Sequence, residues 1–388
     1  MTRIAFVHGR FPAGGAERVT LDIAGFLKKK GGYEIYVYSS RVNESMMTDQ
    51  IRSVVTVRQL PSQLIQTRRA REIERLVVSD GIDILVQINK PISGIEGITE
   101  RTGCKSVIAC HGEPFWQRYV IIHRRQKGVF RKLMWVLFNR KRFADGRLAM
   151  EMAVARTASY LKHCDAYTVL CESYKNEIEG TLGISASESK IYAIENAEPE
   201  VNDIVLEKEK MFLFCGRFEN WSKRIDRLLR IWSKVQSRLP DWKLVLVGDG
   251  PAAGSLRKLA EELKLERVEF EGMKKDVKPY YDRAWAVCLT SETEGWPLVL
   301  CEGQAHGCIG MAFGCTSGIA EILGPDGESG FIVPAFDEDL YAETMVRIAS
   351  SSKEDEMRIR TNSILKRGRY TPDVTGRKWQ RLFDMLSE

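Results

Sequence analysis

RIAFVHGRFPAGGAERVTLDIAGFL, residues 3–27, sets the pattern of the first half of the chain. Arg3–His8 is a short apolar run that ends at Gly9, and a loop then leads to the helical pattern of Ala16–Leu27. A strand, a glycine-containing turn and a helix in this order are typical of the opening of a parallel βα unit.

The second half of the chain begins in the same way. KMFLFC, residues 210–215, is an apolar run that ends at Gly216, and helical spacing follows at Ile225–Val235. Both halves then contain further short apolar runs typical of buried strands: Ile82–Gln87, Ser106–Ala109, Ala166–Leu170, Trp242–Val247, Arg267–Phe270, Ala286–Leu289 and Phe331–Val333. The sequence therefore predicts an α/β protein with two Rossmann-like, doubly wound parallel-sheet domains.

The polar stretch Asn196–Lys210 is the predicted linker. We expect a first domain over residues 1–200 and a second over residues 201–372. Val374–Leu386 is amphipathic, and residues 373–388 are predicted to form a helix that crosses back to the first domain. Because open parallel sheets bind ligands beyond the carboxyl ends of their strands, two such domains facing across a cleft suit a two-part ligand or two substrates.

Composition excludes several classes of protein. The 388 residues are 44% hydrophobic and 28% charged, which is ordinary for a globular chain and rules out a wholly disordered or collagen-like one. Nine cysteines without a Cys-x-x-Cys pair indicate neither a zinc site nor a disulfide framework. Apolar runs such as Leu133–Phe138 are far shorter than the ~20 residues of a spanning helix, and Met1–Gly9 has no signal-peptide pattern. We expect a cytoplasmic protein.

The net charge of +6 comes from one segment. Residues 118–147 hold ten Lys or Arg and one acid, so the rest of the chain carries −3. Phe130–Arg142 combines an apolar helical face with basic residues, a pattern that fits an anionic membrane surface. It also fits a core helix with a solvated face, and periodicity does not separate the two. Nucleic acid is not an expected partner, because no binding motif accompanies the charge.

The first glycine-rich turn is Gly14-Gly15-Ala16-Glu17. Gly9 and Gly14 have the spacing of a phosphate loop, but Gly15 and Ala16 stand where that motif needs Lys and Ser or Thr. An NTPase is therefore not expected. Two glycines let backbone amides approach an anion closely, and a simple tight turn is the alternative interpretation.

The most informative segment is SETEGWPLVLCE, residues 291–302, which follows a predicted strand. Pro297 suits the first position of a helix, where no amide hydrogen is needed, and we expect that helix to run to Ala305. Its free N-terminal amides, at Leu298 and Val299, form a predicted anion site.

Two glutamates flank this anion site. Glu294 precedes the helix and Glu302 lies on it, about 7 Å further along the axis than Pro297. Since a carboxylate can accept two hydrogen bonds from a vicinal diol, the pair fits the ribose and the sugar ring of a nucleoside diphosphate sugar. The alternative is that Glu302 merely solvates a helix.

Cations follow the first strand of the second half. Arg217 and Lys223 flank a short loop, and two cations there suit a diphosphate. They would stabilise the negative charge that develops when a glycosyl bond to a diphosphate breaks. Arg224 can take the part of either cation, and an exposed basic loop is the alternative.

Taken together, these motifs resemble those of retaining family 4 glycosyltransferases of GT-B fold. The resemblance spans nearly the whole chain, with motifs in the family's order: Gly14–Glu17, His111-Gly112, Gly216-Arg217 with Lys223, Val247–Pro251, Glu294 with Glu302, and Ser317–Glu321. Two departures are a slightly longer loop between Arg217 and Lys223, which leaves the choice between Lys223 and Arg224 open, and Ala320 where proline is common.

The resemblance implies a role for each of these residues. On the donor side, Arg217 and Lys223 would bind the diphosphate, Glu302 the ribose and Glu294 the transferred sugar. Gly272 and Met273 would meet the base.

On the other side of the cleft, Gly14 and Gly15 would approach the donor phosphate and the acceptor. His111 would lie near the reacting sugar. It follows the apolar run Ser106–Cys110 and so lies at a ligand-binding sheet edge, where a purely structural histidine is the alternative.

The implied activity is transfer of a hexose from a UDP- or GDP-linked sugar to a glycan or lipid-linked saccharide, in polysaccharide, capsule or lipopolysaccharide-type biosynthesis. No metal or other cofactor is expected. Two alternatives stay open: a nucleotide-sugar epimerase of the same fold, and a non-catalytic protein that binds a membrane surface.

Overall fold

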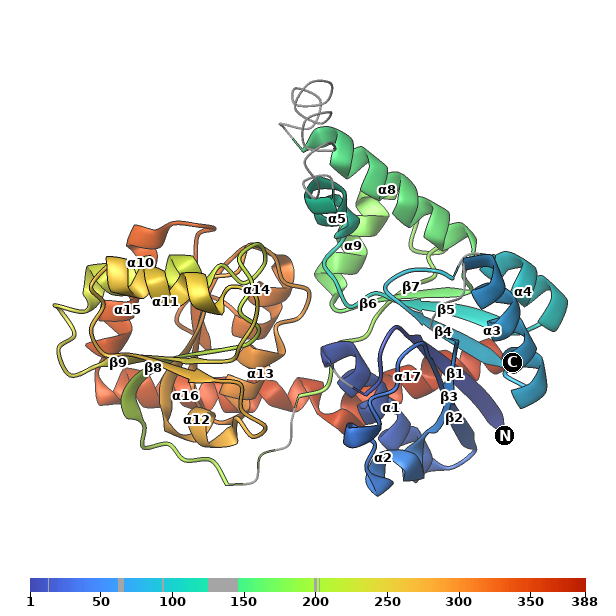
Figure 1. Ribbon diagram of the computed structural model, residues 1–388, viewed down its shortest axis with the longest axis horizontal. Coiled ribbons are helices and arrows are strands. Elements are labelled where there is room, and N and C mark those ends of the chain that lie inside the picture. The colour runs from blue at the N-terminus through green and yellow to red at the C-terminus, as the bar shows by residue number, and fades with distance from the viewer. Residues whose placement is uncertain (13, 62–65, 93, 125–145, 199–200, 202) are drawn as a thin grey trace. The chain divides into compact units, whose positions relative to one another are not determined.

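The computed structural model describes residues 1–12, 14–61, 66–92, 94–124, 146–198, 201 and 203–388. These residues form two compact units (Figure 1). One contains Met1–Glu195 together with Thr375–Glu388, and the other contains Asn196–Val374. The divisions expected from the sequence lay at 200/201 and 372/373. The basic segment Phe130–Arg142 lies outside the described residues.

The described part of the first unit is built on a seven-stranded sheet in the order β3-β2-β1-β4-β5-β6-β7, with every pairing parallel. Its strands are β1 (Thr2–His8), β2 (Tyr33–Ser39), β3 (Thr56–Gln59), β4 (Ile84–Ile88), β5 (Lys105–Ala109), β6 (Ala166–Val169) and β7 (Ile191–Ala193). The chain leaves β1 to one side for β2 and later returns to the other side for β4. This reversal creates a crevice at the carboxyl ends of β1 and β4, where open α/β sheets bind ligands.

Helices cover both faces of this sheet. They are α1 (Gly15–Lys30), α2 (Asp49–Val54), α3 (Gln66–Asp80), α4 (Ile95–Thr102), α5 (Gln117–Arg124), α8 (Arg147–Lys162) and α9 (Glu172–Leu182). Successive side chains of a strand point to opposite faces. Accordingly, Ile4 and Phe6 of β1 share a core with α1, whereas Ala5 and Val7 share a separate core with α3 and α4.

The second unit repeats the design with six described strands in the order β10-β9-β8-β11-β12-β13, again all parallel. These strands are β8 (Glu209–Cys215), β9 (Lys243–Val247), β10 (Val268–Gly272), β11 (Ala284–Leu289), β12 (Ile309–Phe313) and β13 (Gly330–Val333). Here the reversal lies between β8 and β11. The predicted α/β class with two doubly wound parallel sheets is confirmed.

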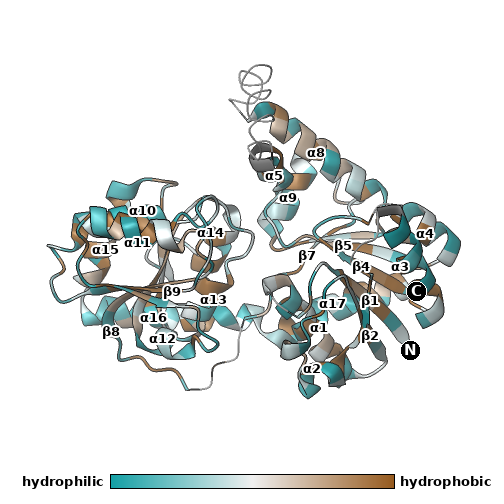
Figure 2. Ribbon diagram, viewed as in Figure 1, coloured by the Kyte–Doolittle hydropathy of each residue, from teal (hydrophilic) through white to brown (hydrophobic). Residues whose placement is uncertain are grey.

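The helices of the second unit also lie on both faces of its sheet (Figure 1). They are α10 (Ile225–Val235), α11 (Ala253–Glu262), α12 (Lys278–Arg283), α13 (Leu298–Ala305), α14 (Ser317–Leu323), α15 (Glu338–Ala349) and α16 (Lys353–Arg367). Phe212 and Phe214 of β8 pack in one core with α10, α11 and α15. Figure 2 shows the same division by hydropathy, with apolar residues on the strands and polar residues on the outer faces of helices such as α11.

The last helix, α17 (Pro372–Ser387), supplies core residues to the first unit. Trp379, Leu382 and Phe383 belong to the core that contains Phe6. The Phe383 ring meets the Phe6 ring edge-on, with centroids 6.5 Å apart. Gly376 faces Phe26 so closely that a Cβ atom would overlap the ring. Within the described residues, no helix has both the length and the apolar character needed to cross a membrane.

Replacing Phe383 with alanine should destabilise the first unit by about 3–5 kcal/mol, because it removes a fully buried ring and leaves a cavity. Differential scanning calorimetry of the full chain measures this as a lower melting temperature. The control is Arg381→Ala, at an exposed position of the same helix, which should leave the melting temperature nearly unchanged. Equal melting of Phe383→Ala and the wild type would contradict the docking of α17.

Candidate active site

The candidate site of the second unit is assembled by strand pairing. Phe212 of β8 lies opposite Ala286 of β11 in the parallel ladder, so the loops that leave these two strands emerge at the same edge. The loop after β8 carries Arg217 and Lys223, and the loop after β11 carries Glu294. This edge is also the point of topological reversal, where ligands bind in such folds.

Lys223 and Glu294 meet at this edge. The Lys223 Nζ atom lies 2.7 Å from Glu294 Oε1, and the Ser291 hydroxyl donates to the same oxygen at 2.5 Å. The Glu294 side chain is only 8% exposed. A carboxylate buried to this degree requires a charged or hydrogen-bonding partner, and Lys223 and Ser291 provide both.

Arg224 is engaged elsewhere. Its guanidinium pairs with Asp226 at 3.0 Å and with Glu292 at 3.3 Å, while its backbone has a φ of 45° as the N-cap of α10. The Thr290 hydroxyl donates to the Arg224 carbonyl, which fixes this residue against the loop after β11. The geometry therefore favours Lys223 over Arg224 as the cation next to Glu294.

Arg217 lines a cavity of about 410 Å³. Its side chain is 67% exposed and pairs with Glu219 at 3.0 Å. The cavity is lined by Gly216, Arg217, Gly248, Asp249, Gly250, Pro251 and Met273. Because the Arg217 guanidinium is largely exposed, it remains available to a ligand in this cavity.

The walls of this cavity are backbone packed on backbone. Phe218 N donates to Asp249 O at 2.9 Å, and Gly248 N donates to Gly272 O at 2.9 Å. A Cβ atom at Gly248 would overlap the carbonyl oxygen of Gly216, and one at Gly250 would overlap Phe218. The Val-Gly-Asp-Gly-Pro motif thus has glycines where two loops approach too closely for any side chain.

Gly272 ends β10 with a φ of 71°, and the next residue, Met273, is one of the most exposed apolar side chains of the described chain. The structure therefore brings Met273 to the same cavity as Arg217, whereas Gly272 contributes the backbone carbonyl described above.

Glu302 lies on α13 and is held from the neighbouring helix α12. The hydroxyl of Tyr281, a buried residue of α12, donates to Glu302 Oε2 at 2.7 Å. Cys215, at the end of β8, is near both groups; burial first, and then the charge of Glu302, raises the pKa of its thiol to about 11. One oxygen of Glu302 is therefore fixed in direction before any ligand binds.

Helix α13 starts one residue later than expected. Pro297 is its N-cap, in an extended conformation, and no side chain caps the helix. Leu298 and Val299 are half-buried at its first turn. Glu294 lies three residues before this N-cap and Glu302 lies in the second turn, so the predicted succession of acid, helix start and acid is present.

The other predicted site residues belong to the first unit. Gly14 is the N-cap of α1 with a φ of 131°, and Gly15 is the first residue of that helix. His111 follows β5, and its backbone amide donates to Asn89 Oδ1 at 2.7 Å. The structure thus pairs Lys223 with Glu294 and places Arg217 and Glu302 in the same unit, each with another partner. The roles of all these residues stay predictions.

Sequence reasoning missed three residues of the second unit. Tyr281 and Ser291 hold the two glutamates, as described above. Glu198 is the third: its side chain is 2% exposed, and burial raises the pKa of its carboxyl to about 8 despite a contact with the Cys301 thiol of α13. Only Ser291, which lies within the quoted acidic segment, had a sequence signal.

Both halves of the chain are similar to known proteins. Residues 13–197 match a family model described as Glycosyltransferase Family 4, and residues 209–351 match one described as Glycosyl transferases group 1. An uncharacterized glycosyltransferase from Haemophilus influenzae is 27% identical over 82% of both chains. The amylovoran biosynthesis glycosyltransferase AmsD from Erwinia amylovora is 28% identical over 56% of this chain and 61% of its own.

Among solved structures, Anabaena Alr3699/HepE in complex with UDP and glucose superposes with a TM-score of 0.73 at 15% identity, covering 99% of this chain and 100% of that one. At this identity the likeness concerns the fold, which is GT-B. Both halves of the chain thus carry glycosyltransferase family domains, and the chain is a glycosyltransferase of GT-B fold.

Glu198 should make stability fall with rising pH. Its pKa is about 8 in the folded state and 4.5 in a free side chain, so the folded state binds more protons between these values. The contribution of Glu198 to the unfolding free energy then decreases between pH 4.5 and about 8. Above pH 8 it stays constant. Glu198→Gln removes this decrease, and at pH 8.5 it should be more stable than the wild type by about 2–4 kcal/mol.

Calorimetry at a series of pH values tests this expectation. Near pH 5 the two proteins should melt at nearly the same temperature. The exposed Glu207→Gln is the matched control, with the same chemical change in the same segment, and it should follow the wild type at every pH. Parallel profiles for wild type and Glu198→Gln would show that Glu198 is not held neutral.

Proposed function

We propose that this chain is a retaining hexosyltransferase. It would move a hexose from a UDP- or GDP-linked sugar to a glycan or lipid-linked saccharide, in polysaccharide, capsule or lipopolysaccharide-type biosynthesis. The observation that carries the proposal is the contact of Lys223 with Glu294 at the reversal point of the second sheet, where Glu294 lies four residues before the start of α13. The relatives support it, since AmsD is named for amylovoran biosynthesis and HepE was crystallised with UDP and glucose.

In this proposal, Arg217 and Lys223 bind the diphosphate of the donor. Negative charge builds on the leaving diphosphate as the glycosyl bond breaks. Cations already placed in a partly buried site stabilise that charge without reorganising, and one such group is worth about 3–4 kcal/mol of the barrier. The uncapped amides at Leu298 and Val299 add the partial positive charge of a helix N-terminus.

The two glutamates hold the sugars at either end. Glu302 accepts hydrogen bonds from the ribose hydroxyls, and Tyr281 keeps the carboxylate turned in one direction. Glu294 accepts from the hydroxyls of the transferred hexose, with Lys223 and Ser291 fixing its position. Orientation of this kind lowers the barrier by avoiding the entropy cost of aligning the reactants.

The base of the donor occupies the cavity beside Met273. That cavity presents mainly backbone, from Gly216, Gly248 and Gly250, so the contacts to the base come from main-chain groups. Its volume lies within the ordinary range for small-molecule sites.

In the reaction we propose, the bond between the anomeric carbon and the diphosphate oxygen breaks, and a bond to the acceptor oxygen forms on the same face. A departing phosphate oxygen takes the acceptor's proton, so neither a protein base nor a carboxylate nucleophile is required. Gly14, Gly15 and His111 would approach the reacting groups from the first unit. The proposal includes no metal ion, since two side-chain cations meet the diphosphate.

Cytoplasmic location and contact with a membrane through Phe130–Arg142 remain predictions from the sequence. The epimerase alternative is separated by product analysis, because an epimerase would change the donor without any acceptor.

A thermal-shift panel of UDP-, GDP- and ADP-sugars tests donor binding. A ligand at 100 times its dissociation constant adds about 2.7 kcal/mol to the unfolding free energy. Glu302→Gln should abolish most of this shift, and Glu261→Gln, at an exposed position of α11, should retain it. A panel without any shift, or a shift that survives Glu302→Gln in full, would overturn the assignment of the donor site.

Product stereochemistry tests the mechanism. With a donor identified by the panel, the transferred sugar should keep its anomeric configuration, and a chelator should leave the rate unchanged. An inverted product, a covalent adduct trapped on Glu294, or activity abolished by chelator and restored by magnesium would each contradict the mechanism.

Lys223→Gln should lower kcat/KM by about 10²–10³, because it removes a cation from the leaving diphosphate. Arg224→Gln is the matched control: the same charge is removed at the next residue, and we expect less than a tenfold loss. The double variant Lys223→Gln/Glu294→Gln avoids leaving Glu294 buried without its partner. Equal losses in Lys223→Gln and Arg224→Gln would mean that the two cations share the role.

A further inference from the structure

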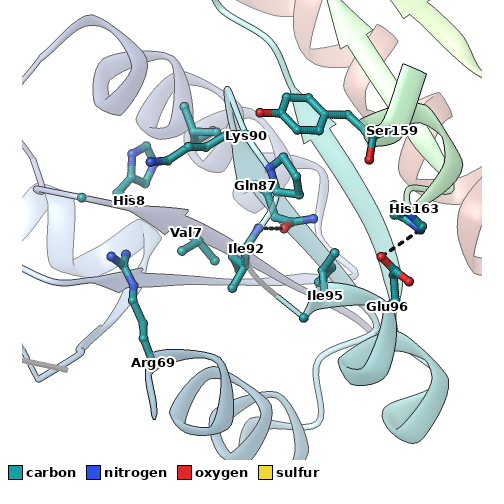
Figure 3. Close-up of a pocket in the computed structure, with 15 residues that line it drawn as sticks. Val7, His8, Arg69, Gln87, Lys90, Ile92, Ile95, Glu96, Ser159 and His163 are labelled. Atoms are coloured by element: carbon teal, nitrogen blue, oxygen red, sulfur yellow. Dashed lines mark hydrogen bonds and ion pairs between the residues drawn. The ribbon is translucent and has the colours of Figure 1, made fainter. Parts of the chain in front are cut away.

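A cavity of about 560 Å³ lies in the first unit, at the carboxyl ends of β1 and β4 (Figure 3). Val7 and His8 line it from β1, and Gln87 and Ile88 line it from β4. These strands are the pair at which the order of the first sheet reverses. The cavity therefore occupies the position where a doubly wound sheet binds a ligand, and the donor site proposed above does not use it.

Two cations face this cavity. Arg69 lies on α3 and Lys90 lies in the loop after β4, and Figure 3 shows both side chains extending toward the end of β1 at His8. Within the part of the chain that the structure describes, neither side chain makes an ion pair with an acidic residue. Two uncompensated positive charges in a concave site attract an anion.

Among the lining residues that the structure describes, Glu96 is the one acid, and it already has a partner. Glu96 Oε1 lies 3.0 Å from His163 Nδ1, which pairs with it when protonated. His8 is buried, with Nε2 2.9 Å from the Thr20 hydroxyl. The charge that the cavity offers to a ligand therefore comes from Arg69 and Lys90.

The wall that carries Lys90 is fixed in place. Gln87 is buried, its amide nitrogen donates to the Ser106 hydroxyl at 2.8 Å, and its amide oxygen accepts from Ile92 N at 2.6 Å. Lys90 N itself donates to Ile88 O at 2.9 Å. Because both ends of the Gln87 side chain are used, the loop from Ile88 to Ile92 is held in one shape before a ligand arrives.

The remaining lining is suited to a sugar. Ile92, Ile95 and Pro91 give an apolar surface, and Ser159 and Tyr160 of α8 line another side. Apolar walls pack against the C–H faces of a saccharide, while hydroxyl groups can exchange hydrogen bonds with its own hydroxyls. The volume is within the ordinary range of sites for small ligands.

We propose that this cavity binds a saccharide that carries an oxyanion, a phosphate or a carboxylate, with Arg69 and Lys90 on the anion. In the function proposed above, it holds the anionic part of the acceptor. That second statement rests on the proposed function, whereas binding of the anionic saccharide does not.

Calorimetric titration of the full chain tests the binding, with glucose 1-phosphate, glucuronate and glucose as probes. Saturating UDP is present throughout, so that the site in the second unit is occupied. We expect at least one anionic probe to bind at least about tenfold more tightly than glucose. Comparing glucose 1-phosphate with glucuronate then shows whether the site prefers a phosphate or a carboxylate. Added salt should weaken this binding, because Lys90 is exposed.

Variants assign the binding to these two side chains. Arg69→Gln and Lys90→Gln should each lower the affinity for the anionic probe about tenfold and leave the affinity for glucose unchanged, since each removes one charge-assisted hydrogen bond. Arg71→Gln is the matched control, with the same charge change at an exposed position of the same helix. Arg69→Lys should restore part of the affinity, and melting curves verify that each variant folds.

Equal affinity for glucose and its anionic derivatives would overturn the proposal, as would anion binding that survives both substitutions. An Arg71→Gln loss as large as the other two would also overturn it, because the effect would then be one of net charge. Loss of the donor thermal shift with intact binding of the anionic probe would instead overturn the proposed function alone.

Discussion

Parallel pairing of β8 with β11 is the interaction on which the candidate active site depends. It brings two loops that are about seventy residues apart in sequence to one sheet edge, where Lys223 reaches Glu294. Neither loop makes such a site alone, because one contributes the cations and the other the carboxylate and the helix start. The buried strands fix the positions of the two loops, and the exposed Arg217 side chain can still move to contact a ligand.

The sequence was sufficient for the architecture. Helix Ile225–Val235 has the predicted bounds, and apolar strand runs such as Lys210–Cys215 are present within a residue or two. Strands such as β2 (Tyr33–Ser39) and β12 (Ile309–Phe313) were not predicted. The tyrosines, isoleucine and valine of β2 favour a strand, so this signal was overlooked, whereas Gly310 and Ala312 weaken the signal of β12. Local apolar periodicity therefore predicts the units, and tertiary packing decides which additional segments pair.

The candidate site was less accessible to sequence reasoning. The acids and cations follow strands in recognisable motifs, but the groups that hold them do not. Tyr281 lies on a short helix before β11 and reaches Glu302 of α13 only in the folded chain, since the two residues are 21 positions apart. Burial raises the pKa of the Glu198 carboxyl, although the Cys301 thiol, about a hundred residues further along the chain, lowers it. Such partners follow from the fold and have no local spacing.

The docking of α17 has a consequence for biosynthesis. Residues Thr375–Glu388 complete the core around Phe6, yet they leave the ribosome after the whole of the second unit. The core surface around Phe6 in the nascent first unit therefore stays uncovered while Asn196–Val374, a separate compact unit, emerges. The first unit is thus completed only after the second has emerged from the ribosome, and during that interval a holdase chaperone has an apolar surface to protect.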